Sequence, residues 1–141
     1  MLEAALIILP LFAIAFAMVD FPLGLFVQNV LRNAVREGVR FAITQQTGAG
    51  GQDAAIKSVV QNNAMGFLSN ASYISITYLN GQTLAAATGV GSNGQGNICT
   101  VSVTNYPWSW IAPIWRGGSM TFNAASSDVM EAPPNGVLPG R

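Results

Sequence analysis

The most constraining feature of this chain is an uncharged apolar segment close to its N-terminus. Residues 4–19 read AALIILPLFAIAFAMV, with Glu3 just before them and Asp20 just after them. This segment has 16 residues, or about 24 Å as a helix, which is slightly fewer than the roughly 20 residues that span a bilayer. Continuing it through Asp20 to Val27 makes it long enough. Such a segment must be buried, either in a membrane or among copies of the same chain.

The segment does not read as a secretory signal that is still to be cleaved. Such signals carry basic residues before the apolar run and small residues at a cleavage site after it, and this sequence shows neither. We therefore expect that a leader has already been removed and that Met1 is the mature N-terminus. An ordinary membrane anchor is the alternative.

Glu3 stands at the mouth of the apolar segment. An acid in the first turn of a helix is favoured by the helix dipole, typically by about 0.3–1 kcal/mol. That effect does not explain an acid beside a surface that must become buried, because a buried carboxylate needs a partner. We expect Glu3 to pair with an N-terminal amine, its own or a neighbour's, and to serve assembly.

Two helices are expected. The first runs over about residues 4–46, some 64 Å, so its N-terminal half must protrude from any small domain. Pro10 and Pro22 each remove a backbone donor and should kink or locally open it. The second runs over about residues 53–68, with one apolar face and with Asp53 as N-cap or first-turn acid.

The remainder reads as strands. Alternating apolar residues predict strands at 73–79, 98–104 and 119–127, the last with Met120, Phe122 and Ala124 pointing inward. Asn80-Gly81 predicts a type I′ hairpin turn, with a returning strand over residues 82–88. Two helices followed by about four antiparallel strands predict an α+β fold.

Three features interrupt or accompany these strands. Residues 89–96 are rich in glycine and lack a P-loop lysine, so we expect a flexible surface loop. The proline- and tryptophan-rich residues 106–115 should interrupt the sheet. Cys99, the only cysteine, is expected as a small buried residue in a strand.

The chain therefore divides into three parts. Residues 1–46 form an assembly helix, of which residues 1–27 belong to a membrane or to a filament core. Residues 47–131 form an α+β head. Residues 132–141 hold three prolines and two glycines and are expected as an extended arm.

The second half of the long helix carries a basic stripe. Arg32, Arg36 and Arg40 recur every four residues and so share one face. Asp20 is the only charge between Glu3 and this stripe, and it lies about 18 Å along the axis from Arg32. We expect Asp20 to pair with the stripe of a neighbouring copy. The alternative is that Asp20 caps amides that Pro22 leaves open.

Three tryptophans, Trp108, Trp110 and Trp115, cluster in one segment. They either cover the sheet and the first helix as part of the core or form an apolar surface patch that joins subunits or contacts a target.

Composition excludes several classes of function. The chain has no histidine, a formal net charge of zero and only 9% charged residues. A nucleic-acid footprint is therefore not expected, nor is a histidine-based nucleophile or a common zinc site. We expect no catalytic, cofactor-binding or metal-binding residues and no enzyme activity.

A short string in the long helix is similar to a known signature. Residues 34–42, AVREGVRFA, resemble the AxREGxRxA signature of TadE-like pilins, the pilin-like proteins of tight-adherence (Tad) pili. Those proteins also open with a glutamate, an apolar run with an early proline, and an acid followed by phenylalanine, here Glu3, Pro10 and Asp20-Phe21. The strand with Tyr106-Pro107 and the closing strand before Glu131 look similar too, so the resemblance covers nearly the whole chain.

The resemblance implies a bacterial envelope protein whose leader is removed by a prepilin peptidase. It implies an inner-membrane location before assembly, contact with pilus assembly machinery, and polymerisation with copies of itself into an extracellular filament. Pro22-Leu23 stand where the family usually has Gly-Arg, which makes a relative that builds a filament by itself plausible. The alternative is a membrane-anchored minor pilin that primes assembly or acts as a surface adhesion module.

Overall fold

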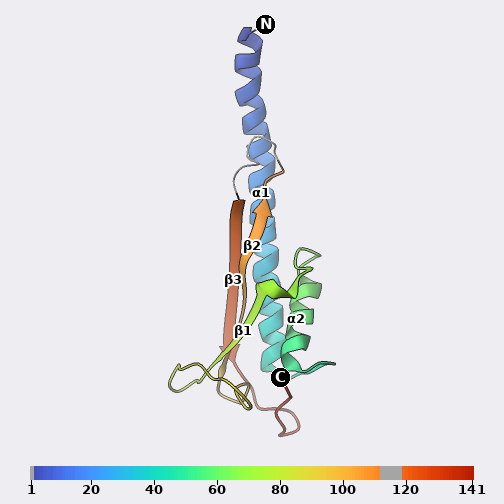
Figure 1. Ribbon diagram of the computed structural model, residues 1–141, viewed down its shortest axis with the longest axis vertical. Coiled ribbons are helices and arrows are strands. Elements are labelled where there is room, and N and C mark those ends of the chain that lie inside the picture. The colour runs from blue at the N-terminus through green and yellow to red at the C-terminus, as the bar shows by residue number, and fades with distance from the viewer. Residues whose placement is uncertain (1, 112–118) are drawn as a thin grey trace.

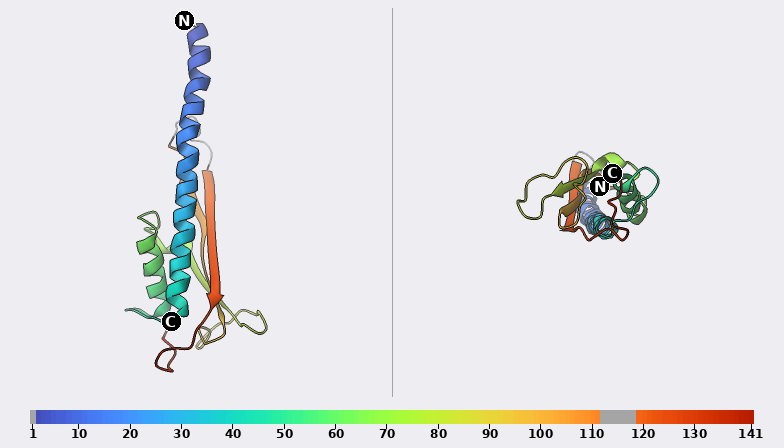
Figure 2. Two further views of the ribbon diagram at one scale, coloured as in Figure 1. Left: turned by 180° about the vertical axis from the view of Figure 1, so that it is seen from behind. Right: turned by 90° about the horizontal axis from the view of Figure 1, so that it is seen from below.

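One long helix organises the molecule in the computed structural model, which describes residues 2–111 and 119–141 (Figure 1). The elements follow in the order α1 (Leu2–Ile43), α2 (Gln52–Asn63), a short 3-10 turn η1 (Ala71–Tyr73), β1 (Ile74–Leu79), β2 (Ile98–Ser109) and β3 (Ser119–Val129). The sheet lies along one side of α1 and α2 along the other, and the N-terminal part of α1 projects beyond both (Figure 2). The predicted α+β fold is confirmed.

The sheet is antiparallel with the order β1-β2-β3, three strands rather than about four. The expected returning strand over residues 82–88 is wrong, because only Leu79 and Ala86 form a bridge there. The turn is also wider than a type I′ turn. The amide of Asn80 donates to the carbonyl of Ala85 at 2.8 Å, and Leu84 adopts a positive φ of 57°. Residues 80–85 are therefore part of the turn, and too few residues remain before residue 88 to form a strand that pairs with β1.

β2 is longer than expected and runs through the proline-containing segment as far as Ser109. A bulge between Val103 and Tyr106, with Asn105 at a φ of 53°, shifts the register against β3. β1 pairs with β2 only as far as Val103. Beyond the bulge one edge of β2 therefore has no partner strand among the described residues, and Pro107 is tolerated there.

The helices also differ from expectation in detail. α1 is helical at every residue from Leu2 to Ile43, so neither proline opens it. α2 ends at Asn63 rather than at residue 68, since Met65 and Gly66 turn the chain with positive φ angles of 52° and 87°. Asp53 lies in the first turn of α2 but does not cap it; Gly51 is the N-cap residue.

The buried core of the head begins at Val27, the first residue of α1 that belongs to it. The largest apolar side chains that are fully buried come from both helices, from the central strand and from the segments just before and just after the sheet: Val27, Leu31, Val35, Ile56, Val60, Leu68, Val101, Val103, Cys99 and Met130. Phe122 and Ala124 point inward as expected, whereas Met120 is 45% exposed because it lies beyond this core.

Gly38 sets the approach of α1 to α2. A Cβ added at Gly38 would lie 2.4 Å from Cγ2 of Val60, whereas one at Gly24 would meet only ordinary contacts, the nearest at 3.5 Å from Phe122. Gly38→Ala should lower the free energy of unfolding by about 1–3 kcal/mol through overpacking. Gly24→Ala should instead raise it by up to about 1 kcal/mol, because alanine favours helix.

Denaturant unfolding followed by tryptophan fluorescence measures both variants. A Gly38→Ala protein as stable as the wild type would show that the two helices do not depend on this close approach.

Candidate assembly surface

The first half of α1 has almost no cover within its own chain. Leu6, Ile7, Leu9 and Met18 each expose between 69% and 76% of their surface. Their large apolar neighbours on the helix, Leu11, Phe12, Ile14 and Val19, are also more than half exposed. An apolar surface of this extent marks a site of contact with a membrane or another protein.

The same helix has the dimensions of a membrane span. The stretch Leu6–Ile43 contains an 18-residue window with a mean hydropathy of 2.3. Only 6% of that window is buried within the structure. By length and composition one helix of the described chain could therefore cross a bilayer. The low burial separates it from the core helix of an ordinary soluble protein.

Asp20 marks the point where the exposed half of α1 meets the head. Its side chain is only 2% exposed, and its Oδ1 accepts a hydrogen bond from the amide of Ile111 at 3.2 Å. The chain itself thus supplies a donor to Asp20 from the segment that follows β2, and the predicted pair with an arginine of a neighbouring copy stays a prediction. Asp20 thus fastens the end of β2 to α1.

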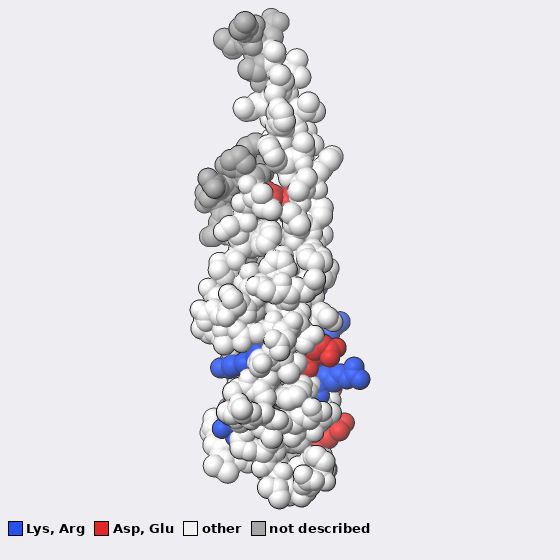
Figure 3. All heavy atoms as spheres, turned by 90° about the vertical axis from the view of Figure 1, so that its right-hand side faces the viewer, with Lys and Arg blue, Asp and Glu red and all other residues white. Residues whose placement is uncertain are grey.

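Arg32, Arg36 and Arg40 are all exposed on α1. None of them forms an ion pair with any other residue that the structure describes; the ion pair found there joins Arg141 and Asp53. On the face shown in Figure 3 the charged side chains gather over the lower half of the molecule, and most of the surface above them is uncharged. The basic stripe is therefore available to a partner.

The tryptophans divide between core and surface. Trp108 packs against the core, with its ring 6.0 Å from that of Phe122. Trp110 lines a groove between α1 and β3. Trp115 lies outside the described residues, and so do Met1 and the side chain of Glu3.

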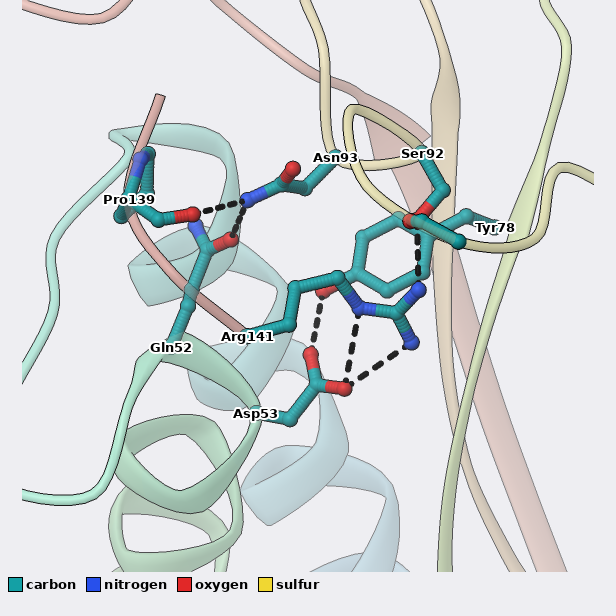
Figure 4. A network of polar contacts seen from close by, with 8 residues as sticks. Gln52, Asp53, Tyr78, Ser92, Asn93, Pro139 and Arg141 are labelled. Carbon is teal, nitrogen blue, oxygen red and sulfur yellow. Dashed lines mark hydrogen bonds and ion pairs between the residues drawn. The ribbon is translucent and has the colours of Figure 1, made fainter. Parts of the chain in front are cut away.

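Arg141 closes the opposite end of the head, a role that the sequence analysis missed. Its Nε and NH2 atoms donate to Oδ2 of Asp53 at 3.1 and 2.9 Å, and its guanidinium lies 4.5 Å from the centre of the Tyr78 ring (Figure 4). It also donates to the hydroxyl of Ser92. Residues 132–141 are therefore not an extended arm; they turn at Gly136 and fold back on α2.

The hydroxyl of Tyr78 completes this cluster by donating to Oδ1 of Asp53 at 2.8 Å. Burial, followed by the hydrogen bond to Asp53, raises the pKa of Tyr78 well above its usual value. The phenol therefore stays protonated and remains a donor. The hydrogen bond to Asp53 likewise raises the pKa of Arg141.

A buried amide network anchors the glycine-rich loop beneath this cluster. Asn93, 1% exposed, donates to Oε1 of Gln52 at 2.7 Å and to the carbonyl of Pro139 at 2.9 Å. The side chain of Gln45 donates to the carbonyl of Asn93 at 2.8 Å. Residues 89–96, expected as a flexible surface loop, are thus pinned at their centre. The proline and glycine residues of the tail did not predict that it would contact this loop through the carbonyl of Pro139.

Neither cluster has the chemistry of a catalytic or metal site. Among the described residues no three histidine, cysteine, aspartate or glutamate side chains could hold a metal ion together. Cys99 is buried in β2 as expected, and burial raises its pKa to about 12, so its thiol is not a nucleophile near neutral pH. What the molecule presents is a set of surfaces for contact.

Arg141→Gln tests the cluster at the end of the tail. The substitution removes a partly buried ion pair, whose side chains are 30% and 28% exposed, and a cation–π contact, and the free energy of unfolding should fall by about 1–2 kcal/mol. Lys57→Gln is the matched control, because Lys57 forms no ion pair with any residue that the structure describes. This substitution should change the free energy of unfolding by less than about 0.5 kcal/mol.

Denaturant unfolding gives both values, and amide exchange in residues 132–141 should rise only in the Arg141 variant. Equal effects of the two substitutions would contradict the proposed closure.

The comparison with protein families gives one match. Residues 1–40 match the family described as TadE-like proteins. The searches of curated proteins and of solved structures found no match. The match covers nearly all of α1 and none of the sheet, so the likenesses noted around Tyr106-Pro107 and Glu131 lie outside it. The resemblance to TadE-like proteins is thus confirmed over residues 1–40.

Proposed function

We propose that this chain is a structural pilin subunit that polymerises through its N-terminal helix into an extracellular pilus-like filament. The observation that carries the proposal is the exposed apolar half of α1. Burying the 13 large apolar side chains that α1 exposes between Leu6 and Phe26, at roughly 1.5–3 kcal/mol each, would exceed the association cost of about 4–15 kcal/mol. Copies of the same chain can supply that cover.

The family match supports an envelope setting for this assembly. TadE-like proteins are pilin-like proteins of Tad pili, and the match spans the helix that would polymerise. In the proposal, a prepilin peptidase removes a leader, the subunit waits in the inner membrane, and the pilus assembly machinery extracts it. The helix is long and apolar enough for that membrane stage.

Charged residues on α1 would tune the packing in this proposal. Glu3 would pair with an N-terminal amine of an adjacent copy and set the axial register. Arg32, Arg36 and Arg40 form an exposed stripe without ion pairs in the described chain, and they would meet acidic groups of neighbours. Asp20, held by the Ile111 amide, would keep the head fixed on its helix.

The alternative is a membrane-anchored minor pilin that primes assembly or acts as a surface adhesion module. The observation that favours it is again the span-like stretch in α1, which one molecule could keep in a bilayer. The two functions differ in whether purified subunits self-associate without lipid.

Removal of residues 1–19 tests the proposal. The shortened chain begins at Asp20, a good N-cap, and keeps the whole core from Val27 onward. It should remain folded and monomeric, whereas the intact chain should form filaments in detergent-free buffer. Negative-stain microscopy and analytical ultracentrifugation measure both. Monodisperse monomers of the intact chain under these conditions would refute the proposal.

A further inference from the structure

An apolar groove lies between α1 and β3, just below the point where the helix leaves the head. We call it the α1–β3 groove. Its volume is about 340 Å³. Residues of both elements and one tryptophan after β2 form its apolar walls: Phe21, Gly24, Leu25, Trp110, Met120 and Phe122. Phe21, Leu25 and Met120 expose 64%, 51% and 45% of their surface although each is large and apolar.

The groove continues upward along α1. A second hollow, lined by Ile14, Ala17, Met18, Phe21 and Pro22, shares Phe21 with it. The apolar surface therefore runs without a break from the protruding helix onto the head. An occupant that covers one hollow would also meet the other.

The solvent-accessible surface area of the chain indicates how much surface its neighbours would have to bury. The structure exposes 8709 Å², whereas a compact monomer of 14.8 kDa exposes about 7,000 Å². The excess, about 1,700 Å², is roughly twice the 800 Å² that one partner buries in a standard interface. One contact would leave half of it exposed; two contacts, one given and one received, would cover it.

We propose that the α1–β3 groove receives the exposed apolar face of α1, residues 4–19, from a second copy of this chain. The inference rests on the proposed function and names the surface on which the helix docks. Each copy then gives its helix to one neighbour and receives a helix from another. Such a heterologous contact does not pair a surface with itself, so it repeats into an open filament unless the rotation closes a ring.

The occupant fits the groove in size and charge. A cavity of about 150 Å³ holds one benzene-sized group, so the groove takes about two large side chains from one helix face. Residues 4–19 supply such side chains at every turn and carry no charge. They therefore bring no cation close to Arg32, which also lines the groove.

A photocrosslink from the groove tests this assignment. A benzoylphenylalanine replaces Met120, and filaments are grown without lipid from an equal mixture of ¹⁵N-labelled and unlabelled chains. After illumination, mass spectrometry should find Met120 joined to a peptide within residues 2–19, in mixed-isotope products that prove a link between copies. Within one chain, position 120 cannot reach Leu9, because Leu9 lies about 22 Å along the helix from Gly24, which lines the groove with Met120.

Ser127 provides the matched control, since it is exposed on the same strand but lies outside the groove. The product with residues 2–19 should be lost when the photoreactive residue is moved there. Filaments in which Met120 links only to its own chain, to another head or to residual lipid would overturn the docking site and leave the proposed function standing. Wild-type protein that forms no filaments would overturn both.

A charge in the groove gives a second readout that needs no photochemistry. Met120→Asp should abolish filaments while the head stays folded, because Met120 is already half exposed in the single chain. Ser127→Asp should leave filaments unchanged. Normal filaments from Met120→Asp would contradict the proposal even if the photoreactive side chain proved too bulky to admit the helix.

Discussion

The rest of the structure depends on a single helix that is too long for the domain it carries. α1 spans 42 residues, yet its buried core residues begin only at Val27. Residues 4–19 carry no charge, and the large apolar side chains from Leu6 to Val19 have almost no cover in their own chain. A soluble monomer with this surface would be unstable against association. The head therefore carries an apolar helix segment that needs cover from a membrane or from other protein chains.

The head is arranged to hold that helix firmly from both sides. Gly38 lets α2 approach closely, and the sheet covers the opposite side of α1 (Figure 2). Asp20 fastens the far end of β2, while Arg141 and the amides around Asn93 close the other end. A rigid joint between helix and head means that the packing of the helices in an assembly also fixes the positions of the heads.

The sequence predicted what depends on local pattern and failed where distant segments meet. The long helix, the second helix, three strands and the buried Cys99 followed from periodicity. The position of Pro107 inside β2 did not follow from periodicity, because a proline is tolerated there only since β1 pairs with β2 no further than Val103. The closure by Arg141 joins residues 88 positions apart, and the groove needs two elements side by side. For Asp20 the pattern showed that a partner was needed but not that its own chain supplies one.

The central claim is that other copies cover residues 4–19 in the assembled state. A cysteine at Leu9, tested with a water-soluble maleimide, measures this directly, because Cys99 is buried and gives no background. In lipid-free assemblies Leu9→Cys should resist labelling while Ser127→Cys reacts. Equal labelling of the two positions in the assemblies would contradict the account.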